Sequence, residues 1–244
     1  MKAQALRRAA AWLRRHAGAR LLAALLALGA DPAVLAQVPP TAAQIAGYSG
    51  LHAAAQRGDL AALERALGGG ADLRSVDASG RTAVHVAAFA RQHEVLRRLA
   101  KAGADLGALE NDRYDAVTIA AVADDEATLR VLLQLGASAR LVTSRYDGTA
   151  LIAAAHLGHD GVVRQLIAAG APLDHVNNLH WTAVIEAVVL GDGGPRHQAT
   201  LRALLDAGAD PRLADRQGRT PLALARQRGL AAMITLLERA EARR

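Results

Sequence analysis

A Gly-Ala step recurs along this chain at nearly constant spacing, and no other feature constrains the fold as much. Successive steps are 33, 33, 34 and 38 residues apart. A fixed period of this size is typical of a stack of similar supersecondary units, each burying its apolar face against its neighbours. The steps are Gly70-Ala71, Gly103-Ala104, Gly136-Ala137, Gly170-Ala171 and Gly208-Ala209.

Two helices are predicted in each unit. Upstream of each Gly-Ala step lies an apolar triplet such as Leu129, Leu132 and Leu133, whose spacing places the three side chains on one helix face. The glycine then follows the helix end, where it can adopt the left-handed conformation without a steric penalty. An earlier helix begins after a threonine cap, and Pro221 follows such a cap at the first helical position. The pattern predicts an all-α solenoid of helix–turn–helix units joined by short loops.

This pattern resembles the ankyrin repeat family from about residue 41 to residue 244. The resemblance is carried by Thr220-Pro221-Leu222, by the looser copy at residues 82–87, by Gly158-His159 and by the Gly-Ala-Asp closures. It implies β-hairpin-like loops, a concave face that binds partner proteins, and histidines (His52, His85 and His159) that bond structurally between units. The caps of the six units are Ser49, Thr82, Asp115, Thr149, Thr182 and Thr220.

The departures from the family pattern fall in the middle of the chain. The usual loop glycine is replaced by Arg113, Asp147 and His180. The fifth unit is longer, with a glycine-rich stretch at residues 191–194 after Trp181 and its neighbours, and is similar to a variant of bacterial ankyrin proteins. The stretch lacks the Lys-Ser/Thr of a phosphate loop, so we expect a flexible loop between helices.

The first 36 residues have the order of a secretory signal. Basic residues come first, residues 21–30 are uncharged, and small residues occupy positions 34 and 36. About ten uncharged residues are too few to span a bilayer, which needs about 20. We expect a cleaved signal at 1–36, a leader at 37–41, a repeat domain at 42–244, and a periplasmic or secreted protein. A frayed amphipathic helix, an uncleaved anchor and the twin-arginine route, whose motif is missing, are the alternatives.

Charge and cysteine content narrow the partner classes. The chain has 29 Lys and Arg against 23 Asp and Glu, a formal charge of +6, but residues 1–36 hold six of the basic residues and one acid. The remaining 23 basic and 22 acidic residues give +1, so the sequence predicts neither a nucleic-acid partner nor membrane binding after signal cleavage. The absence of cysteine excludes disulfides and thiol catalysis. We expect a monomer whose partner is another protein.

Residues for chemistry are scarce. The histidines lack metal-ligand spacing, no Gly-x-Ser-x-Gly elbow is present, and the acids at 124–126 suit the start of a helix better than a calcium loop. We therefore predict no metal, no cofactor and no catalytic residues. The favoured function is a non-catalytic binding module, in a protective (immunity) or stress-response role. A hydrolase using Glu186 and His197 of the fifth unit, or a purely structural scaffold, is the alternative.

Two groups of residues are candidates for partner binding. The first is an apolar patch on the concave side of units two and three, although these side chains could instead fill gaps between helices. The second is the set of loop tips, which carry the aromatic and arginine residues enriched at binding hot spots. Glu186 could pair with a base of the partner or with a neighbouring arginine. The patch is Val86, Phe89, Ile119 and Val122, and the loop tips are Arg113, Tyr114, Arg145, Tyr146, His180 and Trp181.

Overall fold

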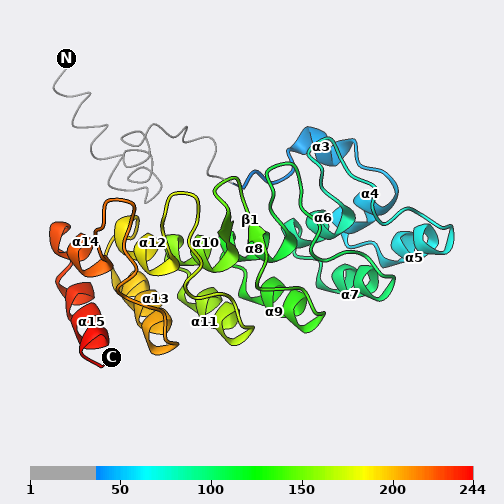
Figure 1. The fold of residues 1–244 in the computed structure, drawn as a ribbon. Helices are drawn as coiled ribbons and strands as arrows, with labels where there is room; N and C mark the ends of the chain where they lie inside the picture. The colour runs from blue at the N-terminus through cyan, green and yellow to red at the C-terminus, as the bar shows by residue number, and fades with distance from the viewer. Residues whose placement is uncertain (1–36, 244) are drawn as a thin grey trace, which may run out of the picture. The chain divides into compact units, whose positions relative to one another are not determined.

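Helices form nearly all of the regular structure in residues 37–243, the part of the chain that the computed structural model describes. The expected signal at 1–36 lies outside the described residues. Pro39–Arg244 forms one compact unit, and within it a short helix is followed by six helix pairs (Figure 1), which confirms the predicted repeat fold. The helices are α3 (Ala42–Ala46), then α4 (Gly50–Arg57) with α5 (Leu60–Gly68), α6 (Ala83–Phe89) with α7 (His93–Lys101), α8 (Ala116–Val122) with α9 (Glu126–Gln134), α10 (Ala150–Leu157) with α11 (Asp160–Ala168), α12 (Ala183–Val189) with α13 (Pro195–Asp206), and α14 (Pro221–Gln227) with α15 (Ala231–Ala242).

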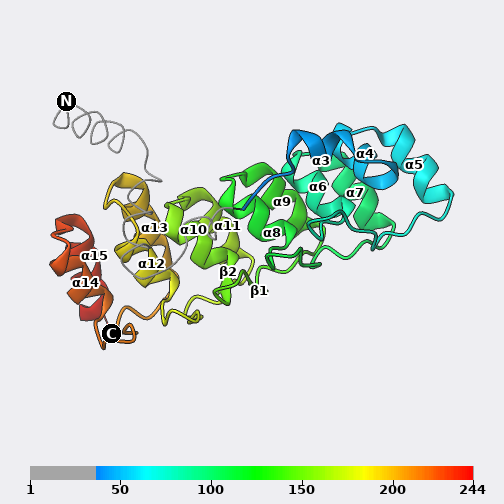
Figure 2. The ribbon, with the colours of Figure 1, turned by 90° about the horizontal axis from the view of Figure 1, so that it is seen from above.

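The helix pairs stack in two rows. The first helices of the pairs pack side by side, so that α10 contacts both α8 and α12, and the second helices form a parallel outer row in which α11 contacts α9 and α13. Figure 2 shows the same succession of pairs from above. The loops between pairs lie along one edge of the inner row (Figure 1). No helix in the described residues is long and apolar enough to cross a membrane.

Helix ends follow the predicted chemistry. The side chain of Asp115 accepts a hydrogen bond from the Thr118 N–H at 2.8 Å, and Thr149, Thr182 and Thr220 cap their helices in the same way. At the other end, the glycines of the five Gly-Ala steps all have positive φ, from 75° to 100°. These glycines satisfy the last carbonyl groups of the outer helices in a conformation that other residues adopt only with strain.

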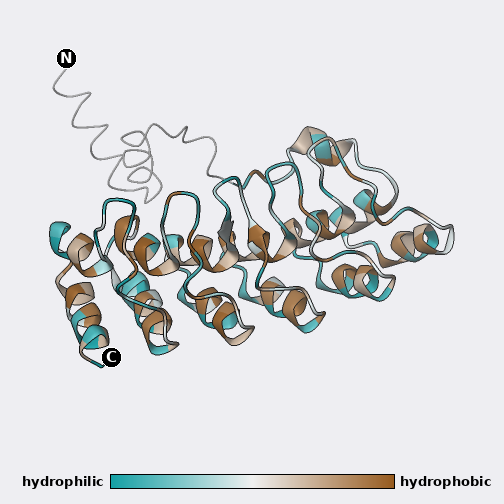
Figure 3. Ribbon diagram, viewed as in Figure 1, coloured by the Kyte–Doolittle hydropathy of each residue, from teal (hydrophilic) through white to brown (hydrophobic). Residues whose placement is uncertain are grey.

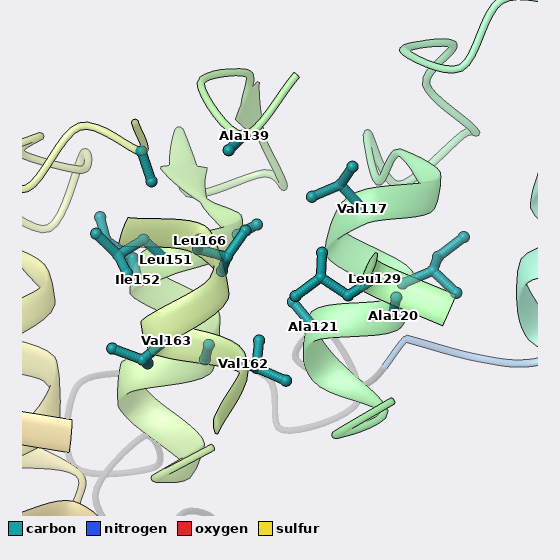
Figure 4. Packing of buried hydrophobic residues seen from close by; sticks show 14 of the residues in the cluster. Val117, Ala120, Ala121, Leu129, Ala139, Leu151, Ile152, Val162, Val163 and Leu166 are labelled. Atoms are coloured by element: carbon teal, nitrogen blue, oxygen red, sulfur yellow. The ribbon is translucent and has the colours of Figure 1, made fainter. Parts of the chain in front are cut away.

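The core is continuous from pair to pair. Leu129, Leu151 and Leu166 are fully buried between neighbouring pairs (Figure 4). The alanine pairs, such as Ala120-Ala121, are buried as well, because a small side chain lets adjacent inner helices approach closely. Figure 3 shows hydrophobic residues mainly on the helices, whereas hydrophilic residues occur on the loops and on parts of the helices. Because each pair buries its apolar face only against its neighbours, stability is shared along the stack.

A single side-chain oxygen closes each loop between pairs. In the first loop, the Asp77 carboxylate accepts hydrogen bonds from the Ser79 and Arg81 N–H groups at 2.8 and 2.9 Å. We call the residue in this position the loop acceptor. In the following loops it is Glu110, Ser144, Asn177 and Asp215. The loop of Ser144 is one residue longer and carries the antiparallel strands β1 (Val142–Thr143) and β2 (Gly148–Thr149).

Helix α3 was not predicted from the repeat pattern. Its start is a capping box in which the Thr41 hydroxyl and the Gln44 side chain each accept a hydrogen bond from the other residue's N–H. The helix docks on the first loop, because Gln44 donates to the Ser79 hydroxyl at 3.1 Å and the Tyr48 hydroxyl donates to Asp77 at 2.8 Å. Burial, followed by the hydrogen bond to Asp77, raises the pKa of Tyr48 to about 12.

Candidate protein-binding surface

Neighbouring loops are hydrogen-bonded to each other through the backbone. The N–H of Asn111 donates to the carbonyl of Ser79 at 3.0 Å, and Asn178 donates to Tyr146 in the same way at 2.9 Å. Between them, Ser144 donates to Arg113 at 2.9 Å. These bonds make the loops of units one to five a single ledge, so a partner would meet a pre-formed surface.

Ion pairs join the tips of the middle loops. The Arg113 guanidinium lies 3.1 Å from the Asp147 carboxylate, and Arg145 pairs with Asp112 of the preceding loop. Arg113, Asp147 and His180 also have the positive φ expected at the loop glycine position, from 52° to 66°. Exposed ion pairs of this kind contribute about 0–1 kcal/mol each, so they orient the tips more than they stabilise the fold.

The predicted tip residues divide by exposure. Arg113, Arg145 and His180 are exposed, whereas Tyr114 and Tyr146 are partly buried. Burial raises the pKa of the Tyr114 hydroxyl. Trp181 is only 7% exposed and belongs to the core, so its ring is not available to a partner. The participation of the other five in binding stays a prediction.

The expected apolar patch on units two and three does not form a surface. Val86 and Ile119 are buried between adjacent inner helices, which is the alternative that the sequence left open. Phe89 and Val122 are half-buried, and the Arg81 guanidinium lies 5.6 Å from the centre of the Phe89 ring. The spacing of the inner helices explains the difference, because residues on the flank of one inner helix are covered by the next.

Glu186 is buried and paired within the protein. Its carboxylate accepts a hydrogen bond from the Asn177 amide at 3.0 Å, and its second oxygen lies 3.3 Å from His156 Nδ1. The neighbouring base is therefore a histidine, where an arginine or a partner's base was expected. His197 faces elsewhere, because its ring nitrogens lie 2.9 Å from the Asp192 carboxylate and 2.9 Å from the His156 carbonyl. The two residues considered for a hydrolase thus contact different atoms of His156, and within the described residues they are not hydrogen-bonded to each other.

The histidines at repeat positions act as predicted from the resemblance. His52 Nε2 lies 2.7 Å from the Arg81 carbonyl and His85 Nε2 lies 3.1 Å from the Tyr114 carbonyl, each in the next unit. His159 Nδ1 lies 2.9 Å from the carbonyl of Ala121. Within residues 37–243, no group of three or more His, Cys, Asp or Glu residues is arranged to hold a metal ion.

The sequence reasoning missed a row of exposed aliphatic side chains along the loops. Val76, Leu109, Val142 and Val176 are 57%, 41%, 39% and 44% exposed. They are four of the six large exposed hydrophobic residues in the described part of the chain, and they recur at intervals of 33, 33 and 34 residues. We call these four residues the aliphatic row. The signal in the sequence is an aliphatic residue that recurs once in each of four successive repeats at the same distance from the Gly-Ala step. This residue lies in a loop, whereas the apolar periodicity that predicts the core concerns the helices.

The loop structure explains why these side chains point outward. Val76, Leu109 and Val176 each directly precede a loop acceptor, and Val142 precedes Thr143 in the longer loop. Successive residues of an extended segment point in opposite directions. Asp77, Glu110 and Asn177 turn toward the N–H groups of their own loops, so the residue before each of them faces solvent. In the longer loop the inward-facing residue is Thr143, which is 1% exposed, so Val142 before it faces solvent. A contiguous apolar patch on a soluble protein often marks an interaction site. The regular recurrence of these four side chains makes the loop edge a candidate for such a site.

Comparisons with known proteins agree with this architecture. A family model described as "Ankyrin repeats (3 copies)" matches residues 6–109, 51–143, 118–215 and 151–243. This chain belongs to the ankyrin repeat family. The putative ankyrin repeat protein YahD of Escherichia coli (strain K12) is 41% identical over 95 residues, and this match spans 38% of the chain but only 47% of YahD.

Solved ankyrin structures cover most of the chain. An ankyrin repeat domain from Acinetobacter baumannii AYE is 41% identical, with a TM-score of 0.74 over 78% of this chain and 97% of its own. The structure of the predatory endopeptidase Bd0816 from Bdellovibrio bacteriovorus in complex with immunity protein Bd3460 contains a chain that is 22% identical, with a TM-score of 0.65, over 79% of this chain and 98% of its own. At that identity the second likeness concerns the fold alone.

Proposed function

We propose that this protein is a non-catalytic interaction module that binds another protein along its loop edge. Ankyrin repeats serve protein–protein interaction, and the exposed aliphatic row is the observation that supports a contact on the loops. Covering a half-exposed valine or leucine contributes roughly 1 kcal/mol, about half the value for complete burial. The exposed tips Arg113, Arg145 and His180 would add polar contacts beside the row.

The binding mode follows from the rigidity of the ledge. Backbone hydrogen bonds between loops already fix the surface, so association orders few additional residues and loses little conformational entropy. We propose that the protein acts as a monomer. Its role would be that of an accessory protein, either neutralising a toxic protein or assisting a stress-response enzyme.

The order of the first 36 residues supports the further proposal that the protein is exported to the periplasm. The mature chain would then begin at Gln37 and appear in an osmotic-shock fraction. Amino-terminal sequencing of the protein from that fraction tests this. Recovery of the chain with intact Met1 from the soluble cytoplasm would contradict export but not partner binding.

Affinity capture from periplasmic extract, followed by mass spectrometry, tests the binding surface. The double variant Leu109→Lys with Val142→Lys changes the centre of the aliphatic row, and we expect it to weaken the captured partner's Kd at least tenfold, equivalent to about 1.4 kcal/mol. The matched control is Val38→Lys with Ile45→Lys, which changes two exposed aliphatic residues outside the row. Equal retention of the partner by both double variants would refute the assignment. Capture of no partner would favour the structural scaffold.

A further inference from the structure

A hollow of about 150 Å³ lies between the last two outer helices, α13 and α15. Three arginines line it, Arg202 from α13 and Arg239 and Arg243 from the end of the chain. Its apolar lining includes Leu205 and Leu236. This hollow belongs to the outer row of helices, whereas the aliphatic row belongs to the loops.

Helical spacing brings these side chains together. Arg239 and Arg243 are four residues apart at the end of α15, and Arg202 and Asp206 are four apart on α13, so each helix presents a charged edge toward the other. Leu205 of α13 and Leu236 of α15 line the same hollow. The acid Glu238 of α15 faces a different element, because it pairs with Arg226 of α14 at 2.7 Å.

The charges in the hollow do not balance. Among the residues that the structure describes, Asp206 is the one carboxylate in the lining, and it lies 3.6 Å from Arg243, farther than a hydrogen bond. Neither Arg202 nor Arg239 makes an ion pair with a carboxylate in the part of the chain that the structure describes. Within this described lining, three guanidinium groups and one carboxylate leave two uncompensated positive charges beside the side chains of Leu205 and Leu236. A fully paired arginine such as Arg196, with Asp124 at 2.7 Å, shows the contrast.

We infer that this hollow binds a carboxylate attached to a small apolar group. A guanidinium group matches a carboxylate with two parallel hydrogen bonds, which favours arginine over lysine for this anion. The hollow has about the volume of an enclosed protein cavity that accepts benzene, so it limits the apolar group to the size of a benzene ring or smaller. Two sources share this chemistry, a free organic acid and the carboxyl-terminal residue of a protein.

Titration of the purified protein with sodium benzoate at constant ionic strength, followed by the arginine Nε–H signals in NMR spectra, tests the site. Benzyl alcohol, which has the ring without the charge, is the control ligand. We expect saturable shifts of Arg202 and Arg239 with benzoate and none with benzyl alcohol. No saturation below about 10 mM benzoate, or equal binding of both compounds, would overturn the inference.

Two variants locate the binding. Arg202→Gln with Arg239→Gln should weaken benzoate binding at least tenfold, whereas Arg130→Gln, an exposed arginine of α9 outside the hollow, should not. Arg202, Arg239 and Arg130 are exposed, so we expect both variants to fold. Thermal melting checks that they do. Benzoate binding that survives the double substitution would place the ligand elsewhere and refute the site.

The same titration with a short peptide ending in phenylalanine distinguishes the two sources. Binding of the free-acid peptide at least tenfold more tightly than benzoate, with loss of binding on amidation, would identify a protein terminus. Equal affinity for the peptide and benzoate would identify a small organic acid. The double variant should abolish either interaction.

Discussion

His85 links the second unit to the third, and its environment fixes its protonation state. The Thr82 N–H donates to His85 Nδ1 at 3.1 Å, so Nδ1 must be an acceptor. The proton of the neutral ring is then on Nε2, which donates to the Tyr114 carbonyl at 3.1 Å. The side chain is 1% exposed, and desolvation lowers the pKa of His85 from its ordinary value of 6.5.

We predict that His85→Leu destabilises the protein by about 2–4 kcal/mol at pH 7.5. Leucine leaves the buried Thr82 N–H without a partner, at about 1–3 kcal/mol, and removes the bond to Tyr114, worth about 0.5–1.5 kcal/mol. The Tyr114 carbonyl keeps one bond, from the N–H of Glu110, so it is not left unpaired. The matched control is His52→Leu, because His52 makes the same contact with the next unit but is only half-buried.

The destabilisation caused by His85→Leu should decrease as the pH falls. Because the folded-state pKa of His85 lies below 6.5, the unfolded chain binds more protons as the pH falls through 6.5. The stability contributed by the neutral ring is therefore complete above pH 6.5 and decreases as the pH falls toward the folded-state value, by at most about 1.4 kcal/mol per pH unit. The difference in unfolding free energy between the native protein and His85→Leu should thus be smaller at pH 5.5 than at pH 7.5.

Urea unfolding followed by far-ultraviolet circular dichroism at the two pH values measures this difference. Subtracting the variant from the native protein cancels groups that titrate in both. A difference that is the same at both pH values would refute the assignment of a neutral, buried His85. Equal destabilisation by His52→Leu and His85→Leu at pH 7.5 would refute the role of burial.

Two further predictions, each with a control variant, concern the glycine between two paired helices and the acceptor that closes a loop. Gly158 has a φ of 69° and an added Cβ would lie 2.9 Å from the His197 ring, whereas Gly208, with a φ of 100°, has open space. We expect Gly158→Ala to lower the unfolding free energy by about 2–3 kcal/mol and Gly208→Ala to lower it by about 1 kcal/mol. Adding His197→Ala to Gly158→Ala should restore part of the loss. Equal losses for the two glycine variants in urea unfolding would contradict the contact between the added Cβ and His197. The second prediction concerns the loop acceptor Asp215. Burial alone would raise the pKa of Asp215, but hydrogen bonds from Arg219 and Gln217 lower this pKa below its ordinary value. The stability that the Asp215 carboxylate contributes is therefore present above pH 4 and is lost as the pH falls through the depressed folded-state pKa. At pH 7, Asp215→Ala should lower the free energy of unfolding by about 2–3 kcal/mol, whereas Asp206→Ala, at an exposed position, should lower it by less than about 0.5 kcal/mol. Equal losses for the two variants in thermal melts would exclude the loop-acceptor role of Asp215.

The sequence predicted those parts of the fold that local rules determine. The left-handed glycines, such as Gly103, and the helix caps, such as Asp115, follow from backbone preferences over a few residues. The partner of Glu186 could not be predicted, because His156 is thirty residues away and reaches it only across two packed inner helices. The burial of Val86 likewise depends on how closely the next inner helix approaches, which helical periodicity alone does not specify.

The composition of the loops separates what the fold requires from what it leaves free. The loop acceptor changes from aspartate to glutamate, serine and asparagine along the chain, because any side-chain oxygen at that position can close the loop. The preceding residue faces solvent, so folding does not require an apolar side chain there, and a single exposed valine would need no explanation. Four in successive loops are different, because they recur at intervals of 33, 33 and 34 residues even though Val142 lies one residue farther from its loop acceptor than the others do. The series ends at Ala214, which precedes Asp215 but has little apolar surface to offer.

The length of the aliphatic row sets the size of the proposed contact. Its four members span three intervals between neighbouring helix pairs, or roughly 30 Å if adjacent helices are about 8–10 Å apart. A surface of that length and similar breadth buries about 800 Å² on each partner, the area of a standard stable interface. Leu109 and Val142 occupy the centre, where binding energy concentrates once water is excluded by the surrounding contacts. In this proposal the exposed tips Arg113 and Arg145 would contribute to the polar rim of the interface.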